Sequence, residues 1–338
     1  MKVIREGCDE KIYNSHLWEH YFGNLRVGVL DIETTGLSAA GSSFVLGCLY
    51  DVAGERLFQV LAQNRREEKE ALIEYLDLVS QMDVLITYNG RHFDIPFLVK
   101  RAERVLGISN LELPYDLDLY QLINGHSPIK KLVPNLKQKT VENYMGFWNT
   151  RADEISGKES IELYYSYEST GDEDAERKIL LHNNDDVRQL ARLTKVISKS
   201  DFHKAMMHMG FPVHLNSPGG KSVRLVTSKP RLHRNSLMIY GSQKGDAMDY
   251  RGFAIGDYPA ESKFSSQDKS FCIKLPVIRQ SDYAIVDILA AGLDDSSFTK
   301  LPNYSDGFLV IAHRDSLYPM ETNFFIKEYI TKFIGEEF

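Results

Sequence analysis

Blocks of apolar and polar positions in residues 25–200 predict a sheet covered by helices. Short apolar runs with the length of buried strands lie near 25–32, 44–50, 55–62, 83–88 and 114–118. Helical spacing of apolar positions marks residues near 67–80 and 94–106, and several helices follow. Three consecutive strands, and then strands alternating with helices, indicate an α/β fold with a mixed five-stranded sheet flanked by helices.

The pattern changes at both ends of this region. Residues 1–24 contain an apolar stripe that predicts a leading helix, with packing as its role. A boundary is expected near residue 200, after the polar run Ser198-Lys199-Ser200. Residues 201–338 then predict a smaller α+β domain, to which we assign no role. Its expected strands are 222–227, 237–240, 271–277, 283–288 and 308–313, and its expected final helix is 321–334.

Two carboxylates end the first predicted strand. Alternate residues of a strand point to one face, so Asp31 and Glu33 project together while Ile32 turns into the core. Paired carboxylates of this kind bind divalent metal ions. An Asp-x-Glu triplet at a strand end is most often only a solvated rim, however, so the triplet alone does not decide. The hydroxyls of Thr34 and Thr35 follow at once and leave room beside the acids for a phosphate or sugar.

A second acid follows another strand. Residues 83–98 indicate a buried strand, a turn containing Gly90, and a helix with Asp94 at its start and Pro96 in its first turn. Aspartate and proline both favour those helix positions. Taken by itself, Asp94 could therefore be only a helix cap.

A third acidic segment lies on a helix. In residues 181–193, the apolar positions Val187, Leu190 and Leu193 recur at helical spacing. His182 and Asp186 are four residues apart and share one face of this helix. Asp185 points about 100° away, so Asp186 is the expected partner of His182.

The three segments resemble the motifs of the DEDD superfamily, the ribonuclease H-like 3′ to 5′ exonucleases. Asp-Ile-Glu-Thr-Thr-Gly at 31–36 resembles the first motif. Asn-Gly-x-x-Phe-Asp at 89–94 resembles the second, in the form found in family B polymerase proofreading domains. In the third motif, one branch of the superfamily has tyrosine four residues before its last aspartate and the other has histidine five before. This chain has histidine at the tyrosine spacing.

A closer resemblance is to bacterial ribonuclease H-like proteins of the YprB type. In these, a His-Asn-x-x-Asp segment follows an Arg-x-Asp-Glu-Ile-x-Gly stretch, and this chain has similar segments at 182–186 and 151–157. The resemblance covers roughly residues 25–200, implies a ribonuclease H-like fold there, and does not extend to residues 201–338.

The resemblance implies a metal-dependent 3′ to 5′ exonuclease that cleaves DNA or RNA, with single-stranded ends as the expected substrate. Two divalent ions, Mg²⁺ or Mn²⁺, would be the cofactors. Asp31 would bridge both ions, Glu33 and Asp186 would hold the ion that activates water, and Asp94 would serve the second. His182 would be the general base, because imidazole titrates near neutral pH. The motif residues expected to contact the nucleic acid are Thr34, Thr35, Leu37, Asn89 and Phe93.

The acidic net charge is only weak evidence against a nucleic-acid substrate. The formal net charge of −7 lies entirely in residues 1–200, where two divalent ions would offset more than half of it. No acid occurs among the 44 residues between Asp201 and Asp246, and this basic stretch could follow a phosphate backbone through Arg231 and Arg234. A solvated face of mixed strands is the alternative.

Cysteine usage and hydropathy indicate a cytoplasmic protein. The three cysteines, Cys8, Cys48 and Cys272, are scattered and indicate neither a disulfide framework nor a zinc cluster. The first residues lack the apolar core of a signal peptide, and no apolar run approaches the length of a membrane span.

Two other functions stay open at this point. One is a structure-selective endonuclease on the same scaffold. The other is a non-catalytic module that binds nucleic acid or a protein partner.

Overall fold

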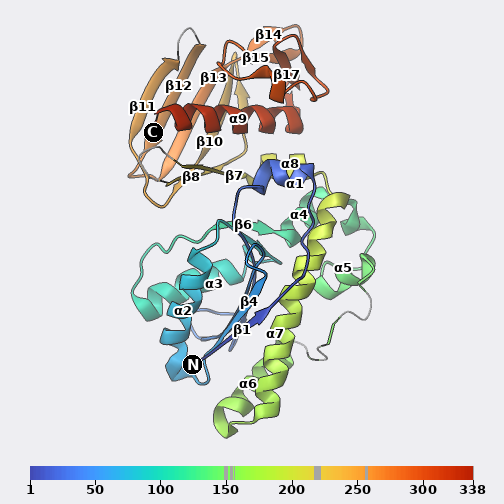
Figure 1. The fold of residues 1–338 in the computed structure, drawn as a ribbon, viewed down its shortest axis with the longest axis vertical. Coiled ribbons are helices and arrows are strands. Elements are labelled where there is room, and N and C mark those ends of the chain that lie inside the picture. Colours follow the sequence, from blue (N-terminus) through green and yellow to red (C-terminus); the bar gives the residue numbers. More distant parts are fainter. Residues whose placement is uncertain (148–150, 153–154, 156, 217–221, 256–257, 338) are drawn as a thin grey trace. The chain divides into compact units, whose positions relative to one another are not determined.

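The computed structural model describes residues 1–338 except 148–150, 153–154, 156, 217–221, 256–257 and 338. The chain divides into two compact units, Met1–Asp201 and Phe202–Phe338, which are described separately (Figure 1). Among the described residues, no helix has both the length and the apolar character needed to cross a bilayer.

A mixed sheet forms the centre of the first unit. Its order is β1-β4-β3-β2-β5-β6. Neighbours from β1 to β2 run antiparallel, whereas β5 and β6 continue the sheet parallel to β2. The strands are β1 (Lys2–Gly7), β2 (Val27–Thr34), β3 (Phe44–Asp51), β4 (Arg56–Leu61), β5 (Val84–Thr87) and β6 (Tyr115–Asp118).

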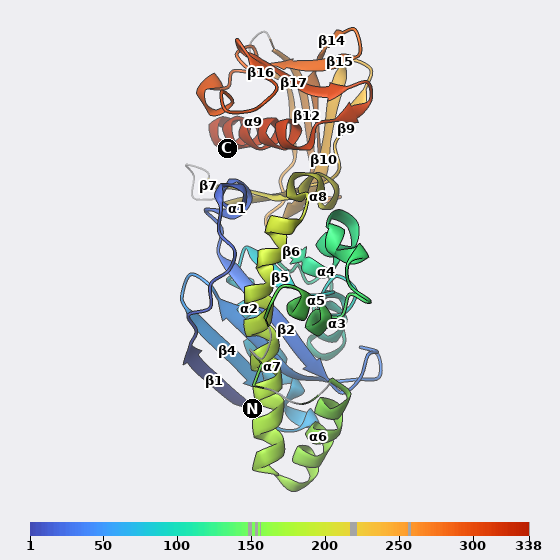
Figure 2. The ribbon, with the colours of Figure 1, turned by 90° about the vertical axis from the view of Figure 1, so that its right-hand side faces the viewer.

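Helices cover both faces of this sheet (Figures 1 and 2). On one face, α2 (Glu68–Ser80) and α3 (Asp94–Arg101) share a core with β2, β3 and β5. On the other, Tyr164 of α6 (Gly157–Thr170) and Ile179 of α7 (Glu173–Leu193) pack on Val45 and Leu61. The remaining helices of the unit are α1 (His16–Phe22), α4 (Leu119–His126) and α5 (Gln138–Tyr144). The candidate site lies on the α7 face.

The first 24 residues differ from the prediction. Instead of one leading helix, Lys2–Gly7 forms β1, which pairs antiparallel with β4, and the helix is limited to His16–Phe22, where Ser15 caps its first turn. The adjacent β-branched residues Val3 and Ile4 favour a strand. The sheet therefore has six strands, where five were predicted.

The second unit is richer in strands than the α+β expectation described. A seven-stranded antiparallel sheet has the order β11-β12-β13-β10-β8-β7, with β9 on β10. A five-stranded sheet has the order β14-β15-β17-β16, with β18 on β17. The first sheet consists of β7 (Pro212–Asn216), β8 (Ser222–Thr227), β9 (Arg231–His233), β10 (Ser236–Lys244), β11 (Tyr250–Ile255), β12 (Tyr258–Ser265) and β13 (Ser270–Pro276). The second consists of β14 (Ile278–Gln280), β15 (Tyr283–Asp287), β16 (Tyr304–Ser305), β17 (Phe308–His313) and β18 (Ser316–Leu317).

The α-helices in the described part of this second unit are α8 (Phe202–Met209) and α9 (Pro319–Glu337). Buried residues alternate with exposed ones along β12 and with half-buried ones along β13, which is the period of a sheet with one face in a core. The aromatic rings of Tyr329 and Phe333 stack on each other along α9.

Candidate active site

The carboxyl end of β2 presents the first two acids. Residues Val27–Leu30 and Ile32 are buried, whereas Asp31 and Glu33 are half-buried. The register with β3 shifts between Glu33 and Thr34, and β2 ends at Thr34, one residue after the second acid. Both carboxylates therefore project from the last regular positions of the strand.

Asp94 approaches the same strand from α3. Its side chain is 5% exposed, and its Oδ1 accepts a hydrogen bond from the backbone N–H of Ile32 at 3.3 Å. The N-cap position of α3 belongs to Phe93, and no side chain caps the helix there. The carboxylate of Asp94 thus binds the backbone of β2 between the two other acids.

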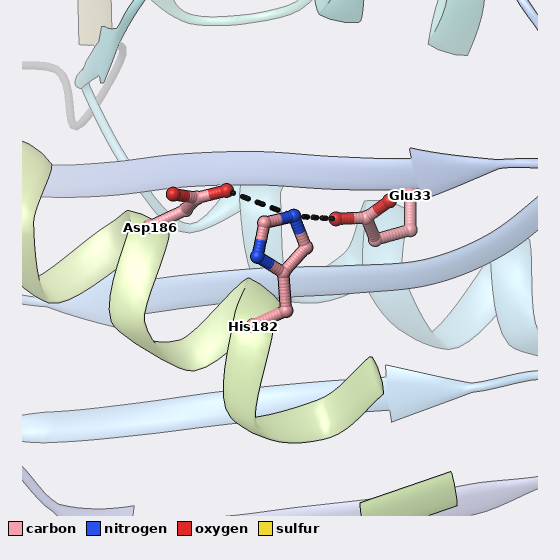
Figure 3. A group of neighbouring side chains, drawn as sticks. All are labelled: Glu33, His182 and Asp186. Atoms are coloured by element: carbon pink, nitrogen blue, oxygen red, sulfur yellow. Dashed lines mark ion pairs between the residues drawn. The ribbon is translucent and has the colours of Figure 1, made fainter. Parts of the chain in front are cut away.

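Helix α7 supplies the third group. His182 Nε2 lies 3.6 Å from Glu33 Oε1 and 3.5 Å from Asp186 Oδ2 (Figure 3). The neighbouring Asp185 points elsewhere and accepts the backbone N–H of Ala152. The spacing of four residues therefore places His182 and Asp186 together, as predicted.

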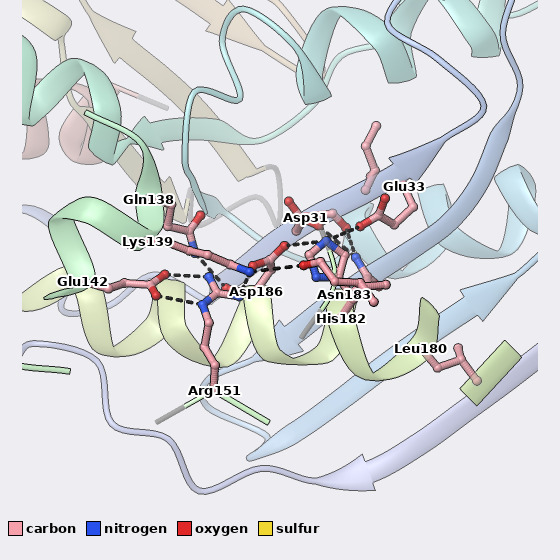
Figure 4. Close-up of polar contacts among 12 residues, drawn as sticks. Asp31, Glu33, Gln138, Lys139, Glu142, Arg151, Leu180, His182, Asn183 and Asp186 are labelled. Carbon is pink, nitrogen blue, oxygen red and sulfur yellow. Dashed lines mark hydrogen bonds and ion pairs between the residues drawn. The ribbon is translucent and has the colours of Figure 1, made fainter. Parts of the chain in front are cut away.

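Asn183 joins α7 to the first acid, and its role was not foreseen from the sequence. Its Nδ2 donates to Asp31 Oδ2 at 2.9 Å, and its Oδ1 accepts from Gln59 Nε2 at 3.3 Å. Gln59 also donates to the carbonyl of Leu180 at 2.9 Å. The amide of Asn183 is thus oriented from β4, and it holds one oxygen of Asp31 in place (Figure 4).

Burial and like charges act strongly on these acids. Burial raises the pKa of Asp31 well above its usual range, and the charges of Asp186, Asp94 and Glu33 raise it further, against the hydrogen bond from Asn183. Burial also raises the pKa of Asp94 to about 7, helped by the charge of Asp116 and opposed by backbone N–H groups. Four carboxylates therefore interact in one place.

Residues of α5 and Arg151 surround Asp186, and these contacts were not predicted from the sequence (Figure 4). Arg151 pairs with one oxygen of Asp186, while Glu142 holds the same guanidinium at 2.7 Å and 2.8 Å. Gln138 Nε2 donates to the carbonyl of Asp186 at 3.2 Å. Arg151 is the first residue of the 151–157 segment that carries the resemblance to the YprB type. Residues 153, 154 and 156 of this segment lie outside the described residues.

A family model described as RNase_H superfamily matches residues 29–198, half of the 338 residues. The chain belongs to this superfamily. The matched range begins within β2 and contains β3 to β6 and α2 to α7, and it includes every residue of the candidate site described above.

This RNase H superfamily member also has more distant similarities. It is 48% identical over 46 residues to a protein named DNA polymerase from Thermococcus aggregans. That stretch is 13% of this chain and 2% of the polymerase, so the chain spans only a small part of that relative.

Two solved structures are similar in fold. One is the family B DNA polymerase of the archaeon Pyrobaculum calidifontis, with a TM-score of 0.42, 20% identity, and coverage of 51% of this chain and 24% of that one. The other is described as an ExoI/SSB-Ct complex, with a TM-score of 0.34, 13% identity, and coverage of 64% and 55%. Both TM-scores lie below 0.5, so the family assignment stands on the matched range alone.

The residues of this RNase H superfamily site fit a divalent cation. Glu33, His182 and Asp186 each offer a ligand atom, and these atoms all lie within 4.8 Å of one another. Carboxylate oxygen and imidazole nitrogen are both ligands of divalent ions. Because the acids raise the pKa of Asp31, a cation would relieve their repulsion.

The predicted nucleic-acid contacts fall into three places. Thr34 Oγ1 donates to the carbonyl of Gly36 at 2.8 Å, and Thr35 Oγ1 accepts from Ser43 N–H at 2.8 Å, so both hydroxyls also shape the loop after β2. The side chain of Leu37 in this loop is 84% exposed.

The second motif contributes Asn89 and Phe93, and a buried aspartate holds their turn. Asn89 has a positive φ of 65°, and its N–H donates to Asp118 Oδ1 at 2.9 Å. Phe93 packs against Phe97, with 5.7 Å between ring centroids, so its side chain is partly buried against the hydrophobic core. The same Asp118 carboxylate accepts from Arg91 N–H at 3.3 Å. Asp118 thus fixes the turn that delivers Asp94.

The two basic residues expected to contact nucleic acid, Arg231 and Arg234, belong to the second unit. Both are exposed; Arg231 begins β9, and Arg234 lies in the turn to β10 with a positive φ of 54°. The carbonyl of Arg234 accepts from Arg279 Nε at 3.1 Å. The turn is therefore held through its backbone while both guanidinium groups reach the surface.

Proposed function

We propose that this RNase H superfamily protein is a metal-dependent nuclease of the DEDD type, a 3′ to 5′ exonuclease that hydrolyses phosphodiester bonds at single-stranded ends of DNA or RNA. One observation carries the proposal. Asp31, Glu33, Asp94 and Asp186 come from three elements, and burial together with the charges of the other three acids raises the pKa of Asp31. Such a cluster costs stability without a cation, so a purely structural role accounts for it poorly.

In this proposal the four acids hold two divalent ions, Mg²⁺ or Mn²⁺. When bound, such ions activate an attacking water and stabilise the leaving oxygen of an in-line displacement. The protein contributes the fixed positions of the carboxylates: Asn183 orients Asp31, and the Ile32 N–H orients Asp94.

A paired guanidinium positions Asp186 in the proposed site. Arg151 brings a cation to this acid, and Glu142 holds the guanidinium by two hydrogen bonds. Burial by itself would lower the pKa of Arg151, but its pairing with Glu142 and Asp186 outweighs this and raises the pKa. The guanidinium is therefore held between Glu142 and Asp186, and it fixes the orientation of the Asp186 carboxylate. Leu37 in the loop after β2 is exposed and is proposed to contact the bases.

The test is digestion of single-stranded DNA and RNA oligonucleotides, labelled at either end, with Mn²⁺ or Mg²⁺. We expect a 5′-labelled strand to shorten stepwise and a 3′-labelled strand to release its labelled mononucleotide first. An Asp31→Asn variant should show no cleavage, because it removes the carboxylate proposed to bridge both ions.

Other outcomes would reject the proposal in distinct ways. Internal fragments from both labelled strands would identify an endonuclease. Absence of cleavage by the wild type with either ion would leave a non-catalytic binding module. Equal cleavage by the Asp31→Asn variant would place the activity outside these carboxylates.

A further inference from the structure

The imidazole of His182 faces two acids instead of open solvent. Its Nε2 lies 3.6 Å from Glu33 Oε1 and 3.5 Å from Asp186 Oδ2 (Figure 3). The residue is 4% exposed, and it projects from α7 on the side that meets β2. The same nitrogen therefore adjoins one acid of its own helix and one acid of the sheet.

An imidazole nitrogen in this position needs a positive partner. In the plane of the ring, Nε2 carries either a proton or a lone pair. A lone pair that faces two carboxylate oxygens is repelled by both, so a proton or a cation must lie between them. A general base, in contrast, must direct its lone pair at the attacking water. The position of Nε2 between two proposed ligands therefore allows a second role for His182, besides the role of base that we expected from the sequence.

We propose that His182 is a direct metal ligand and, with Glu33 and Asp186, forms a site that selects a transition-metal ion such as Mn²⁺ over Mg²⁺. This inference rests on the proposed function, in that it concerns the ion used by the same site. Nitrogen ligands favour transition-metal ions, whereas Mg²⁺ prefers oxygen ligands and retains much of its water. One imidazole beside two carboxylates thus shifts the metal preference of an otherwise all-oxygen site from Mg²⁺ toward Mn²⁺.

The spacing of the ligand atoms agrees with this assignment. Two ligands of one ion, each bound at about 2.1 Å, lie roughly 3.0 to 3.5 Å apart. The observed separations of 3.5 and 3.6 Å need side-chain shifts of only a few tenths of an ångström. All three ligand atoms fall within 4.8 Å of one another, so one ion can reach them together.

The experiment measures metal binding and not only turnover. Calorimetric titration with Mn²⁺ and with Mg²⁺ would compare wild type, His182→Gln, Asp31→Asn and the control His16→Gln, in which an exposed histidine of α1 is replaced. We expect His182→Gln to lose Mn²⁺ affinity by about tenfold or more and to change Mg²⁺ affinity by less than about threefold. The difference between the two affinities should therefore become smaller. His16→Gln should behave as the wild type.

A spectroscopic measurement on the wild type gives the same answer without a variant. Electron spin echo envelope modulation of bound Mn²⁺ should show coupling to a histidine nitrogen, and labelling histidine with ¹⁵N should replace the ¹⁴N pattern. This readout remains decisive even if His182→Gln fails to fold. In a folded variant, the nitrogen coupling should disappear.

The outcomes separate this inference from the proposed function. Mn²⁺ binding without nitrogen coupling, or with unchanged affinity in His182→Gln, would overturn the ligand assignment and leave the nuclease proposal in place. If such a variant also lost turnover, His182 would be the base. Absence of any Mn²⁺ or Mg²⁺ binding by the wild type would overturn both.

Discussion

Replacing Asp94 by asparagine should stabilise the metal-free protein at alkaline pH, although the change removes a proposed ligand. Burial raises the pKa of Asp94 to about 7, and the charges of Asp116 and Asp118 contribute, against opposing backbone N–H groups. In an unfolded chain, aspartate titrates near 3.9. Asparagine keeps an oxygen for the Ile32 N–H, which Asp94 accepts at 3.3 Å, but it carries no charge.

The expected magnitude follows from this difference in pKa. A shift of about three units corresponds to about 4 kcal/mol, and structural relaxation with entry of water should reduce this to about 1–3 kcal/mol. Because the folded-state pKa of Asp94 is raised, its contribution to stability is fully present below the unfolded pKa and is lost as the pH rises through about 7. The asparagine variant has no such loss. Its advantage should be near zero at about pH 4, grow up to about pH 7, and then stay constant.

The assay is urea unfolding in the presence of a chelator, followed by tryptophan fluorescence. Both tryptophans of the chain, at positions 18 and 148, belong to residues 1–201, so the signal reports on the unit that contains the site. We expect the midpoint for Asp94→Asn to exceed that of the wild type at pH 8.5, with an unchanged slope. Metal should reverse the order, because an ion at 100 times its Kd adds about 2.7 kcal/mol to a protein that binds it.

Asp116→Asn is the matched control. Burial raises the pKa of Asp116 to about 7 as well, opposed by its hydrogen bond from Thr87, yet Asp116 is not a proposed ligand. This variant should therefore gain stability at pH 8.5 and keep the full response to metal. A destabilised Asp94→Asn in chelator at pH 8.5, or a difference that does not change with pH, would refute the reasoning.

Two further predictions concern residues around and beyond the acids. Asn183→Ala should lower the metal affinity measured by calorimetry about tenfold or more, because it removes the donor to Asp31; equal loss in the neighbouring Asn184→Ala would show a general effect on α7. Arg231→Glu combined with Arg234→Glu should weaken binding of single-stranded DNA and flatten its salt dependence, by about 0.7 in slope for each lost phosphate contact. Unchanged binding would mark these exposed arginines as a solvated face.

The elements that carry the site were predictable because their patterns are local. The apolar run before Asp31 predicted β2, and the three-residue apolar spacing around Asp186 predicted the helix that became part of α7. Period two in the strand and period 3.6 in the helix also determine which side chains share a face. The strand β1 was not predicted because it is short and mostly exposed. Its six residues therefore lack a clear pattern of buried positions.

The partners of the acids were not predictable in this way. Asn183 reaches Asp31 across 152 residues of sequence, and Glu142 reaches Arg151 from a different helix. Here Arg151 lies in a loop nine residues after Glu142. Neither pairing leaves a periodic signal, because each depends on how segments pack and not on how one element is patterned. The sequence offered only their position within the motifs: Asn183 follows His182, and Arg151 begins the 151–157 segment.

The role of His182 depends on one residue of spacing. Each residue turns a helix by about 100°, so a histidine four positions before an aspartate lies within about 40° of its direction, whereas one five positions before lies about 140° away. At spacing four, the imidazole and the carboxylate of Asp186 share one face of α7, and Nε2 comes within 3.5 Å of that acid. At spacing five, the ring would point away from this face of the helix. The spacing of this chain therefore places His182 beside Asp186, which agrees with the proposed role as a ligand, and the role of general base stays a prediction that the turnover of His182→Gln would test.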